Sequence, residues 1–416
     1  MIVLSGAGIV LPDRILSPGT LVIDGERLAE VRAGEAHAAG PPGAVVTLGD
    51  HYIVPGFIDV HVHGIAGLDT LGSGDPVKAI AERLPRHGVT AFCPTSVACP
   101  PASLRSLLDQ VARARAARSP GAARVLPAHL ESNFISPEYA GAQPASCLRA
   151  PRAALEGWAR GDAPRGAPAG GFDAADILRE IARAASEVGI VTVAPELDGG
   201  LDLVAWLSSR GHRVSLGHSA ATYEEAKAAI AAGARHATHL FNRMTGVTSR
   251  APGLVGAVLQ TDEVVAEIIC DGVHVHPAVM RVAVAAKGPA RVLAITDGTA
   301  ASGLPIGGRA ALGSQAITAG ETVAVLADGT WAGSLATMDG AFRLLVERVG
   351  LTIADAAIMC STAPARALGL SDLGVIAPGA LADLAVLDRS LSVVQTYIGG
   401  RLAYARGATA APSDSR

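Results

Sequence analysis

Two histidines stand one residue apart at the end of an apolar run, in the stretch PGFIDVHVHG at residues 55–64. Because alternate side chains of a strand point to the same face, we expect His61 and His63 to lie side by side. Imidazole nitrogen is a common ligand of transition metals in proteins. The pair is therefore a candidate metal site.

Four more polar residues end apolar runs further along the chain. Glu131 closes RVLPAHLES, His218 closes HRVSLGH, His239 lies in RHATHLF and Asp297 lies in RVLAITDG. Taken alone, each residue of this kind is more often hydrogen-bonded or capping a turn than bound to a metal. Their recurrence at one strand end after another favours a shared site. Five other histidines are expected to be structural residues that make hydrogen bonds and bind no metal: His51, His87, His129, His212 and His236.

The chemistry of such a site is that of a hydrolase. Imidazole and carboxylate ligands without thiolates suit zinc, iron or manganese, of which zinc is the expected ion. A divalent metal lowers the pKa of a bound water to about 7 and polarises a carbonyl oxygen. A carboxylate that is not a tight ligand can take the water's proton and pass it to a leaving amine. Asp297 is the candidate for this role.

The elements that must position these residues alternate along the middle of the chain. Eight buried runs are typical of strands, and helical patterns follow most of them, for example at 75–87, 101–117, 173–189 and 222–233. The alternation favours an α/β fold, a (β/α)8 barrel of the TIM type. An open doubly wound sheet is the alternative, because periodicity does not show closure. In a barrel, the C-terminal strand ends meet at one mouth.

The two ends of the chain resemble short strands that could not bury a core alone. Asp24-Gly25 and Gly399-Gly400 each separate two apolar runs, which is typical of hairpin turns. We therefore expect a small β-sandwich domain from residues 1–53 plus 365–416, and a barrel from residues 54–364. Three further stretches are expected to be an irregular lid or binding loop at 142–171, a β-hairpin at 312–334 and a disordered tail at 407–416.

Composition excludes several classes of protein. The 416 residues suit a barrel of roughly 250 residues or more plus a smaller unit. A net charge of -4 gives no basic field for nucleic acid or an anionic membrane. We expect a cytoplasmic protein, because the first residues lack a signal-peptide pattern and no apolar stretch is long enough to span a membrane. The five cysteines form no Cys-x-x-Cys pair, which also fits a reducing compartment.

Several motifs give the chain a family resemblance. They are PGFIDVHVHG, HLE, GHSAATYEEA, THLFNRMTGVTSRAPGLVGA, DGVHVHP, TDGTAASG and PGALADLAVLD. Together they resemble the amidohydrolase superfamily and, more closely, the N-acetylglucosamine-6-phosphate deacetylase family, over nearly the whole chain. The first and last motifs are shared across the superfamily, whereas GHSAAT, THLFN and DGVHV are more specific.

The resemblance implies a set of metal ligands. Glu131, His218 and His239 match the main ligands of this family. His61 and His63 match a pair that adds a second metal position in the members that have it. Whether one or two ions bind stays open at this point.

The resemblance also implies how the substrate is held. Asp297 matches the general acid/base, and His274 in DGVHV matches a substrate-binding histidine that helps to polarise the acetyl carbonyl. Asn242, the backbone at Arg243, and Arg250 match the phosphate-binding positions. A guanidinium suits this role because it can bind phosphate through two parallel hydrogen bonds.

Two departures from the family pattern concern the substrate. Ser132-Asn133 follows HLE, where the family usually has Gly-Pro. Gln143 stands in AGAQ, where the family tends to have a histidine near the sugar. Gln143 can hydrogen-bond a sugar hydroxyl but cannot carry charge. The departures leave open which N-acetyl sugar is bound and whether it must carry a phosphate.

The expected function is a metal-dependent deacetylation of an N-acetyl amino sugar 6-phosphate, with N-acetylglucosamine-6-phosphate as the first candidate. One alternative keeps the site but cleaves an unphosphorylated or different N-acyl substrate. Another is a non-catalytic sugar-phosphate binding protein, against which the complete set of metal and acid/base residues weighs. The family resemblance implies a homodimer or homotetramer.

Overall fold

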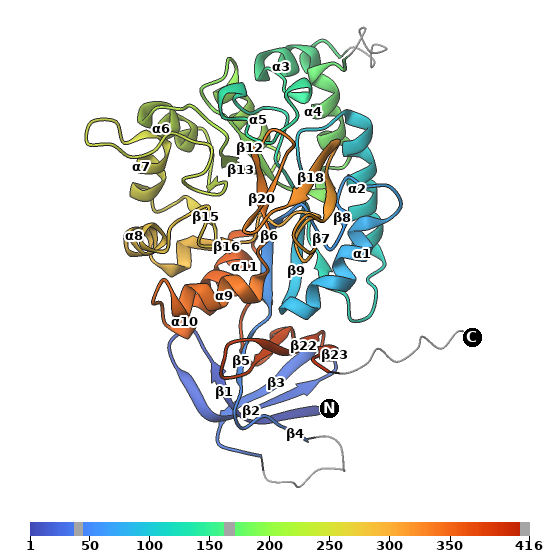
Figure 1. Cartoon of the computed structure of the whole chain (residues 1–416), viewed down its shortest axis with the longest axis vertical. Coiled ribbons are helices and arrows are strands. Elements are labelled where there is room, and N and C mark those ends of the chain that lie inside the picture. The colour runs from blue at the N-terminus through green and yellow to red at the C-terminus, as the bar shows by residue number, and fades with distance from the viewer. Residues whose placement is uncertain (37–44, 162–170, 408–416) are drawn as a thin grey trace.

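A closed barrel forms the centre of the molecule (Figure 1). The computed structural model describes residues 1–36, 45–161 and 171–407. Within these ranges, the parallel barrel strands are β6 (Phe57–Val62), β9 (Val89–Ser96), β11 (Ala128–Leu130), β12 (Val188–Val193), β13 (Arg213–Leu216), β14 (His236–Ala237), β15 (Val265–Ile269) and β16 (Val292–Ile295). Neighbouring strands in the chain are also neighbours in the barrel, and the eight strands correspond to the eight runs predicted from the sequence.

The ring closes between the first and last strands. The amide of Asp297, just after β16, donates to the carbonyl of His61 at 3.0 Å, and the amide of His63 donates to Gly298 at 2.8 Å. The predicted (β/α)8 barrel is therefore confirmed and the open sheet is excluded. Closure also places the residues after β6 next to those after β16, although more than two hundred positions separate them in the sequence.

Helices lie around the barrel strands (Figure 1). A capping box marks the start of α6: the Thr222 hydroxyl accepts from the Glu225 amide, while the Glu225 side chain accepts from the Thr222 amide. The described helices are α1 (Pro76–Arg83), α2 (Pro101–Ala116), α3 (Pro151–Ala159), α4 (Ala174–Arg183), α5 (Gly200–Ser208), α6 (Tyr223–Ala231), α7 (Gly253–Gln260), α8 (Pro277–Lys287), α9 (Met338–Glu347), α10 (Ile353–Ala357) and α11 (Ala363–Ala367). None of them is long and apolar enough to cross a membrane.

Both chain ends build a second sheet, drawn at the bottom of Figure 1. Its strands, within the described residues, are β1 (Ile2–Val10), β2 (Ile15–Asp24), β3 (Arg27–Ala33), β4 (Val45–Thr47), β5 (Tyr52–Pro55), β21 (Leu384–Leu387), β22 (Val393–Ile398) and β23 (Arg401–Ala405). Both predicted hairpins are present, and the turn residues Gly399 and Gly400 have φ of 54° and 71°. Because β5 ends just before β6 begins, this sheet lies at the N-terminal end of β6, away from the barrel mouth. The domain boundaries remain a prediction.

The prediction of an irregular stretch at 142–171 was wrong for part of its length. α3 occupies Pro151–Ala159 and buries Ala154 and Gly157. Proline at the first helical position and the helix-forming residues after it explain this helix. Residues 162–170 of the stretch lie outside the described residues, as do residues 408–416 of the predicted tail.

The predicted hairpin at 312–334 was also incomplete. An antiparallel sheet of four strands forms among the described residues there: β17 (Arg309–Leu312), β18 (Gln315–Ala319), β19 (Val323–Val325) and β20 (Trp331–Ser334). Short loops after Leu312 and Ala319 allow three successive antiparallel pairings. A bridge from Ser334 to Gly298 attaches this sheet beside the end of β16. It thus becomes one wall of the barrel mouth.

The remaining short elements complete the described chain. The short strands are β7 (Gly64–Ile65), β8 (Leu68–Asp69) and β10 (Arg124–Val125). The short helical turns are Leu84–His87, Pro137–Tyr139, Ala145–Cys147, Ala185–Glu187, Pro289–Arg291 and Ile358–Thr362.

Candidate active site

A cavity of about 440 Å³ opens at the mouth of the barrel. Its lining includes most of the residues that end the barrel strands: His63, Glu131, His218, His239 and Asp297. His61 lies just beneath, fully buried at the end of β6. The structure therefore brings together the six strand-end residues that the sequence pointed to.

The backbone turns sharply at three of these residues. His218, His239 and Asp297 have φ of 49°, 29° and 49°, in the left-handed region that non-glycine residues rarely adopt. Such strain persists only where the surrounding structure enforces it, and it gathers at functional sites. Each of the three follows a strand by two residues and lines the cavity.

The first cluster of possible ligands contains Glu131, His218 and His239. Oε1 of Glu131 lies 2.9 Å from Nε2 of His218 and 2.8 Å from Nε2 of His239. The Nδ1 atom of His218 lies 2.8 Å from the carbonyl of Tyr139, which can only accept a hydrogen bond. In its neutral form His218 thus carries its hydrogen on Nδ1 and presents a lone pair to a carboxylate oxygen. A divalent ion between these two acceptors would satisfy both, so the donor set fits a metal ion.

The second cluster contains His61, His63 and, again, Glu131. The Nε2 atoms of the two histidines lie 3.3 Å apart, and each lies 3.3 Å from Oδ1 of Asp297. Oxygens of Glu131 lie 3.7 Å from Nε2 of His61 and 3.5 Å from Nε2 of His63. Glu131 therefore stands between the two clusters, and its carboxylate is within reach of two metal positions.

Burial and charge act against each other in this group. Burial disfavours the charged form of Glu131, but the two imidazoles beside it hold the pKa of its carboxyl well below the ordinary value. Burial also works against a charged Asp297, yet the hydrogen bond from His63 holds its pKa below the ordinary value. Burial lowers the pKa of His61 to about 3, whereas the bond to Glu131 overcomes burial and raises the pKa of His239 to about 9. Both carboxylates are thus ionised at neutral pH, which suits a cation.

Gln143 lies against the first cluster as well as the cavity. Its Oε1 accepts from the Ala98 amide at 2.7 Å, and its Nε2 donates to Oε2 of Glu131. Ser132-Asn133, the other departure from the family pattern, is buried: the Ser132 hydroxyl donates to the Thr192 carbonyl, and the Asn133 amide donates to the carbonyls of Cys99 and Cys147. Of these positions, Gln143 alone lines the cavity.

The residues expected to hold the substrate divide into two groups. His274, Asn242 and Arg243 line the cavity. Nδ1 of His274 lies 2.6 Å from Oδ2 of Asp271, and its ring packs edge-on against Trp331. Arg250 does not belong to the described residues that line the cavity, and it is exposed. The structure thus brings together every expected site residue except Arg250.

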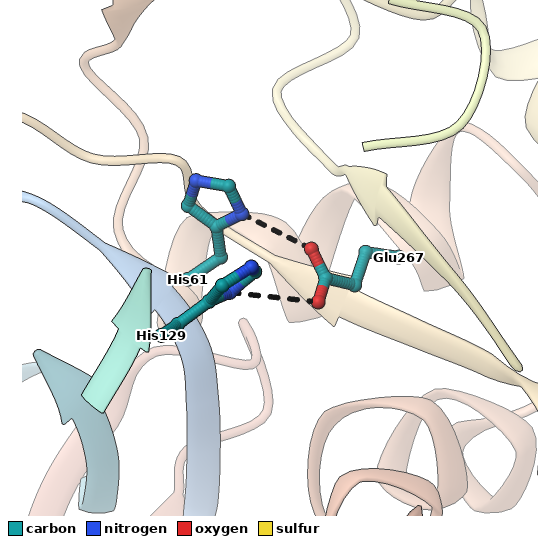
Figure 2. Close-up of side chains that lie close together, drawn as sticks. All are labelled: His61, His129 and Glu267. Carbon is teal, nitrogen blue, oxygen red and sulfur yellow. Dashed lines mark hydrogen bonds and ion pairs between the residues drawn. The ribbon is translucent and has the colours of Figure 1, made fainter. Parts of the chain in front are cut away.

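Sequence reasoning missed Glu267, which lies in the middle of β15. Figure 2 shows its carboxylate facing the rings of His61 and His129. A lone carboxylate inside the buried run VVAEIIC was the available signal, because barrel strands are otherwise apolar. His129, interpreted as structural, uses both ring nitrogens in hydrogen bonds, to Val60 and Thr192.

Comparison with known proteins places the chain in a family. The amidohydrolase family model matches residues 207–403. The N-acetylgalactosamine-6-phosphate deacetylase of Escherichia coli O157:H7 is 35% identical over 364 residues, which are 87% of this chain and 90% of that protein. The N-acetylglucosamine-6-phosphate deacetylase of Rattus norvegicus is 36% identical over 94% of this chain and 90% of its own length. The chain belongs to the N-acetylglucosamine-6-phosphate deacetylase family of the amidohydrolases.

Solved structures agree with this assignment. The N-acetyl-D-glucosamine-6-phosphate deacetylase of Mycobacterium smegmatis superposes with a TM-score of 0.84 at 33% identity, covering 97% of this chain and 100% of that one. A mutant of that enzyme in complex with N-acetyl-D-glucosamine-6-phosphate gives a TM-score of 0.83 at 34% identity, covering 97% and 99%. The family resemblance and the fold predicted from the sequence are thereby confirmed.

Proposed function

We propose that this protein is a metal-dependent deacetylase that hydrolyses the N-acetyl group of an amino sugar 6-phosphate, with N-acetylglucosamine-6-phosphate as the first candidate. One observation carries the proposal: Oε1 of Glu131 lies 2.9 Å and 2.8 Å from the Nε2 atoms of His218 and His239, in a cavity that Asp297 also lines. The relatives support the substrate class, because they are deacetylases of N-acetylglucosamine-6-phosphate and N-acetylgalactosamine-6-phosphate.

The metal ligands follow from the two clusters. Glu131, His218 and His239 would hold one divalent ion, and His61 and His63 would hold a second together with Glu131. Zinc is the proposed ion, with iron and manganese as alternatives, because the donors are imidazoles and a carboxylate without thiolates. A divalent ion at such a site supplies a Lewis acid for the acetyl carbonyl and lowers the pKa of a water.

In this proposal Asp297 is the general acid/base, and His274 stabilises the negative charge on the acetyl oxygen. Asp297 is ionised at neutral pH, so it accepts a proton from the attacking water and then donates it to the leaving amine. Asp271 holds the Nδ1 side of His274, which leaves the other side of that ring for the acetyl oxygen. A preorganised contact of this kind stabilises the charge that develops on the oxygen.

Phosphate binding, the cellular compartment and the oligomeric state complete the proposal. Asn242, the backbone at Arg243, and Arg250 would bind the phosphate, and Gln143 a sugar hydroxyl. The protein would act in the cytoplasm as a homodimer or homotetramer. Buried free cysteines among the described residues are compatible with a reducing compartment.

One alternative substrate class has structural support. Arg250 lies away from the cavity lining, and Gln143 replaces the histidine that the family tends to have near the sugar. Both features would suit an unphosphorylated or otherwise different N-acyl substrate, which makes it the second candidate.

Metal analysis of the purified protein, combined with acetate release, tests the proposal. The substrates compared are N-acetylglucosamine and N-acetylgalactosamine, each with and without the 6-phosphate. We expect divalent metal in the protein and acetate only from a 6-phosphate. Equal release from the free sugars would favour the alternative substrate class, and metal-loaded protein that releases no acetate from any of them would refute the deacetylase proposal.

A further inference from the structure

Glu267 is a fully buried carboxylate in the interior of the barrel, outside the set of metal ligands described above. Its Oε2 lies at hydrogen-bond distance, 3.0 Å, from Nδ1 of His61 (Figure 2). Its Oε1 lies 3.7 Å from Nδ1 of His129, and within the described part of the chain it has no hydrogen-bond partner. The carboxylate therefore makes one side-chain hydrogen bond, and that bond goes to a candidate metal ligand.

The three residues His61, His129 and Glu267 are close enough to hold an ion themselves, but the hydrogen bonds of His129 argue against it. Its Nδ1 donates to the Val60 carbonyl at 3.0 Å, so its Nε2 carries the lone pair. That lone pair accepts from the Thr192 hydroxyl at 3.0 Å.

The Thr192 hydroxyl is also accounted for. It lies 2.8 Å from the Thr238 hydroxyl, which lies 2.6 Å from the Ser215 hydroxyl. This buried chain of hydroxyls uses the free nitrogen of His129. His129 therefore has no lone pair left for a metal. Because the three residues do not form a metal site of their own, the contact between Glu267 and His61 needs another explanation.

We propose that Glu267 is a positioning residue for His61. By accepting from Nδ1, it keeps the hydrogen on that atom and turns the lone pair of Nε2 toward His63 and Glu131. Carboxylates commonly fix metal-binding histidines in this way, and their loss weakens metal affinity by about 10- to 100-fold. Glu267 thereby determines whether the His61–His63 pair takes up an ion. This inference rests on the metal site of the proposed function.

A structural role and a positioning role make different predictions for Glu267. Glu267→Leu leaves the buried Nδ1–H of His61 without its acceptor, which lowers the thermal midpoint of unfolding in either role. The positioning role predicts that Glu267→Leu also weakens metal binding by the folded, metal-free protein. A purely structural role predicts the lower thermal midpoint with unchanged metal affinity.

The test uses calorimetric titration of the metal-free full-length protein with Zn²⁺, together with metal content per chain. The variants are Glu267→Leu, which removes the acceptor, and Glu267→Gln, which keeps an acceptor without the charge. Ser215→Ala is the matched control, because the Ser215 side chain is also fully buried and its hydroxyl bonds to Thr238 rather than to Glu267 or His61. Two Zn²⁺ binding events are expected, and the weaker one is assigned to the His61–His63 pair. Its affinity should fall about 10- to 100-fold in Glu267→Leu and less in Glu267→Gln, and it should be unchanged in Ser215→Ala.

A double-mutant cycle separates positioning from a general effect on the site. If Glu267 acts through His61, adding Glu267→Leu to His61→Asn causes no further loss of affinity. Wild-type ion number and affinities in Glu267→Leu would overturn the proposal, including the case in which the wild-type protein binds a single ion. Should Glu267→Leu fail to fold, the same comparison is made with Glu267→Met, which also removes the acceptor, and wild-type affinities there overturn the proposal.

The titration does not depend on turnover. Protein whose Zn²⁺ binding requires Glu267 but which releases no acetate would refute the proposed function and leave this inference standing. Acetate release with Zn²⁺ binding that is indifferent to Glu267 would do the reverse.

Discussion

Oε1 of Glu131 lies 2.9 Å from Nε2 of His218, although 87 positions separate the two residues in the chain. The contact exists because β11 and β13 both end at the barrel mouth. The same carboxylate reaches toward the histidine pair after β6, so one residue joins the two candidate metal positions. Substitutions of residues near Glu131 can therefore change metal affinity or the rate of catalysis, and the two quantities can be measured separately.

Asp297→Asn is expected to retain metal and lose turnover. The amide cannot accept and return a proton, so kcat should fall about 10²- to 10⁴-fold. Metal content and acetate release are measured on the same preparation. Asp262→Asn, at an exposed carboxylate, is the control and should keep full activity. A folded Asp297→Asn protein with wild-type turnover would remove this residue from the acid/base role.

Gln143→Leu is expected to weaken metal binding more than substrate binding. The substitution removes the donor to Oε2 of Glu131, and loss of such a contact lowers metal affinity by about tenfold or more. Gln315→Leu is a matched control, because Gln315 donates to the neighbouring Ala142 carbonyl and not to Glu131. A raised KM with unchanged metal affinity would show that Gln143 acts on the sugar alone and has no effect through Glu131.

Arg250→Ala tests whether the phosphate is recognised by a residue outside the cavity lining. A lost hydrogen bond between charged groups is worth about 1.5–3 kcal/mol, so KM for the 6-phosphate substrate should rise roughly 10- to 100-fold. Kinetics with the unphosphorylated sugar should stay unchanged, as should both substrates in the exposed control Arg309→Ala. Unaltered kinetics in Arg250→Ala would mean that this arginine has no part in substrate recognition.

His236→Leu is expected to make the protein less sensitive to acid. Burial, followed by the nearby His129 and Arg213, lowers the pKa of His236 in the folded protein to about 3. An unfolded histidine has a pKa near 6.5, so below that pH the unfolded chain takes up a proton that the folded chain refuses. The contribution of neutral His236 to the free energy of unfolding is therefore complete above about pH 6.5 and is lost as the pH falls.

Urea unfolding of the metal-free proteins at pH 7.5 and pH 5 measures this effect. Wild type should lose about 2 kcal/mol more than His236→Leu between the two pH values. Equal losses in the two proteins would show that His236 is protonated in the folded state as well.

Much of the fold was predictable because buried parallel strands are apolar along their whole length. All eight barrel runs were recognised from that pattern, and both terminal hairpins from the glycine-containing turns between apolar runs. Local composition was less reliable where proline and glycine are frequent: α3 lay in a stretch expected to be irregular, and a sheet of four strands replaced one hairpin among the described residues. Proline begins a helix as readily as it ends one, so its presence alone does not decide.

The sequence by itself determined which residue types stand at the strand ends, and from these it predicted the chemistry of a metal-dependent hydrolase. Only the tertiary structure decided how they meet: Glu131 between two clusters, Gln143 against Glu131, Arg250 away from the cavity, and Glu267 behind His61. The physical reason is that periodicity gives the face on which a side chain lies, whereas barrel closure sets the distances between strands far apart in the chain. Glu267 was missed because its position follows from that closure.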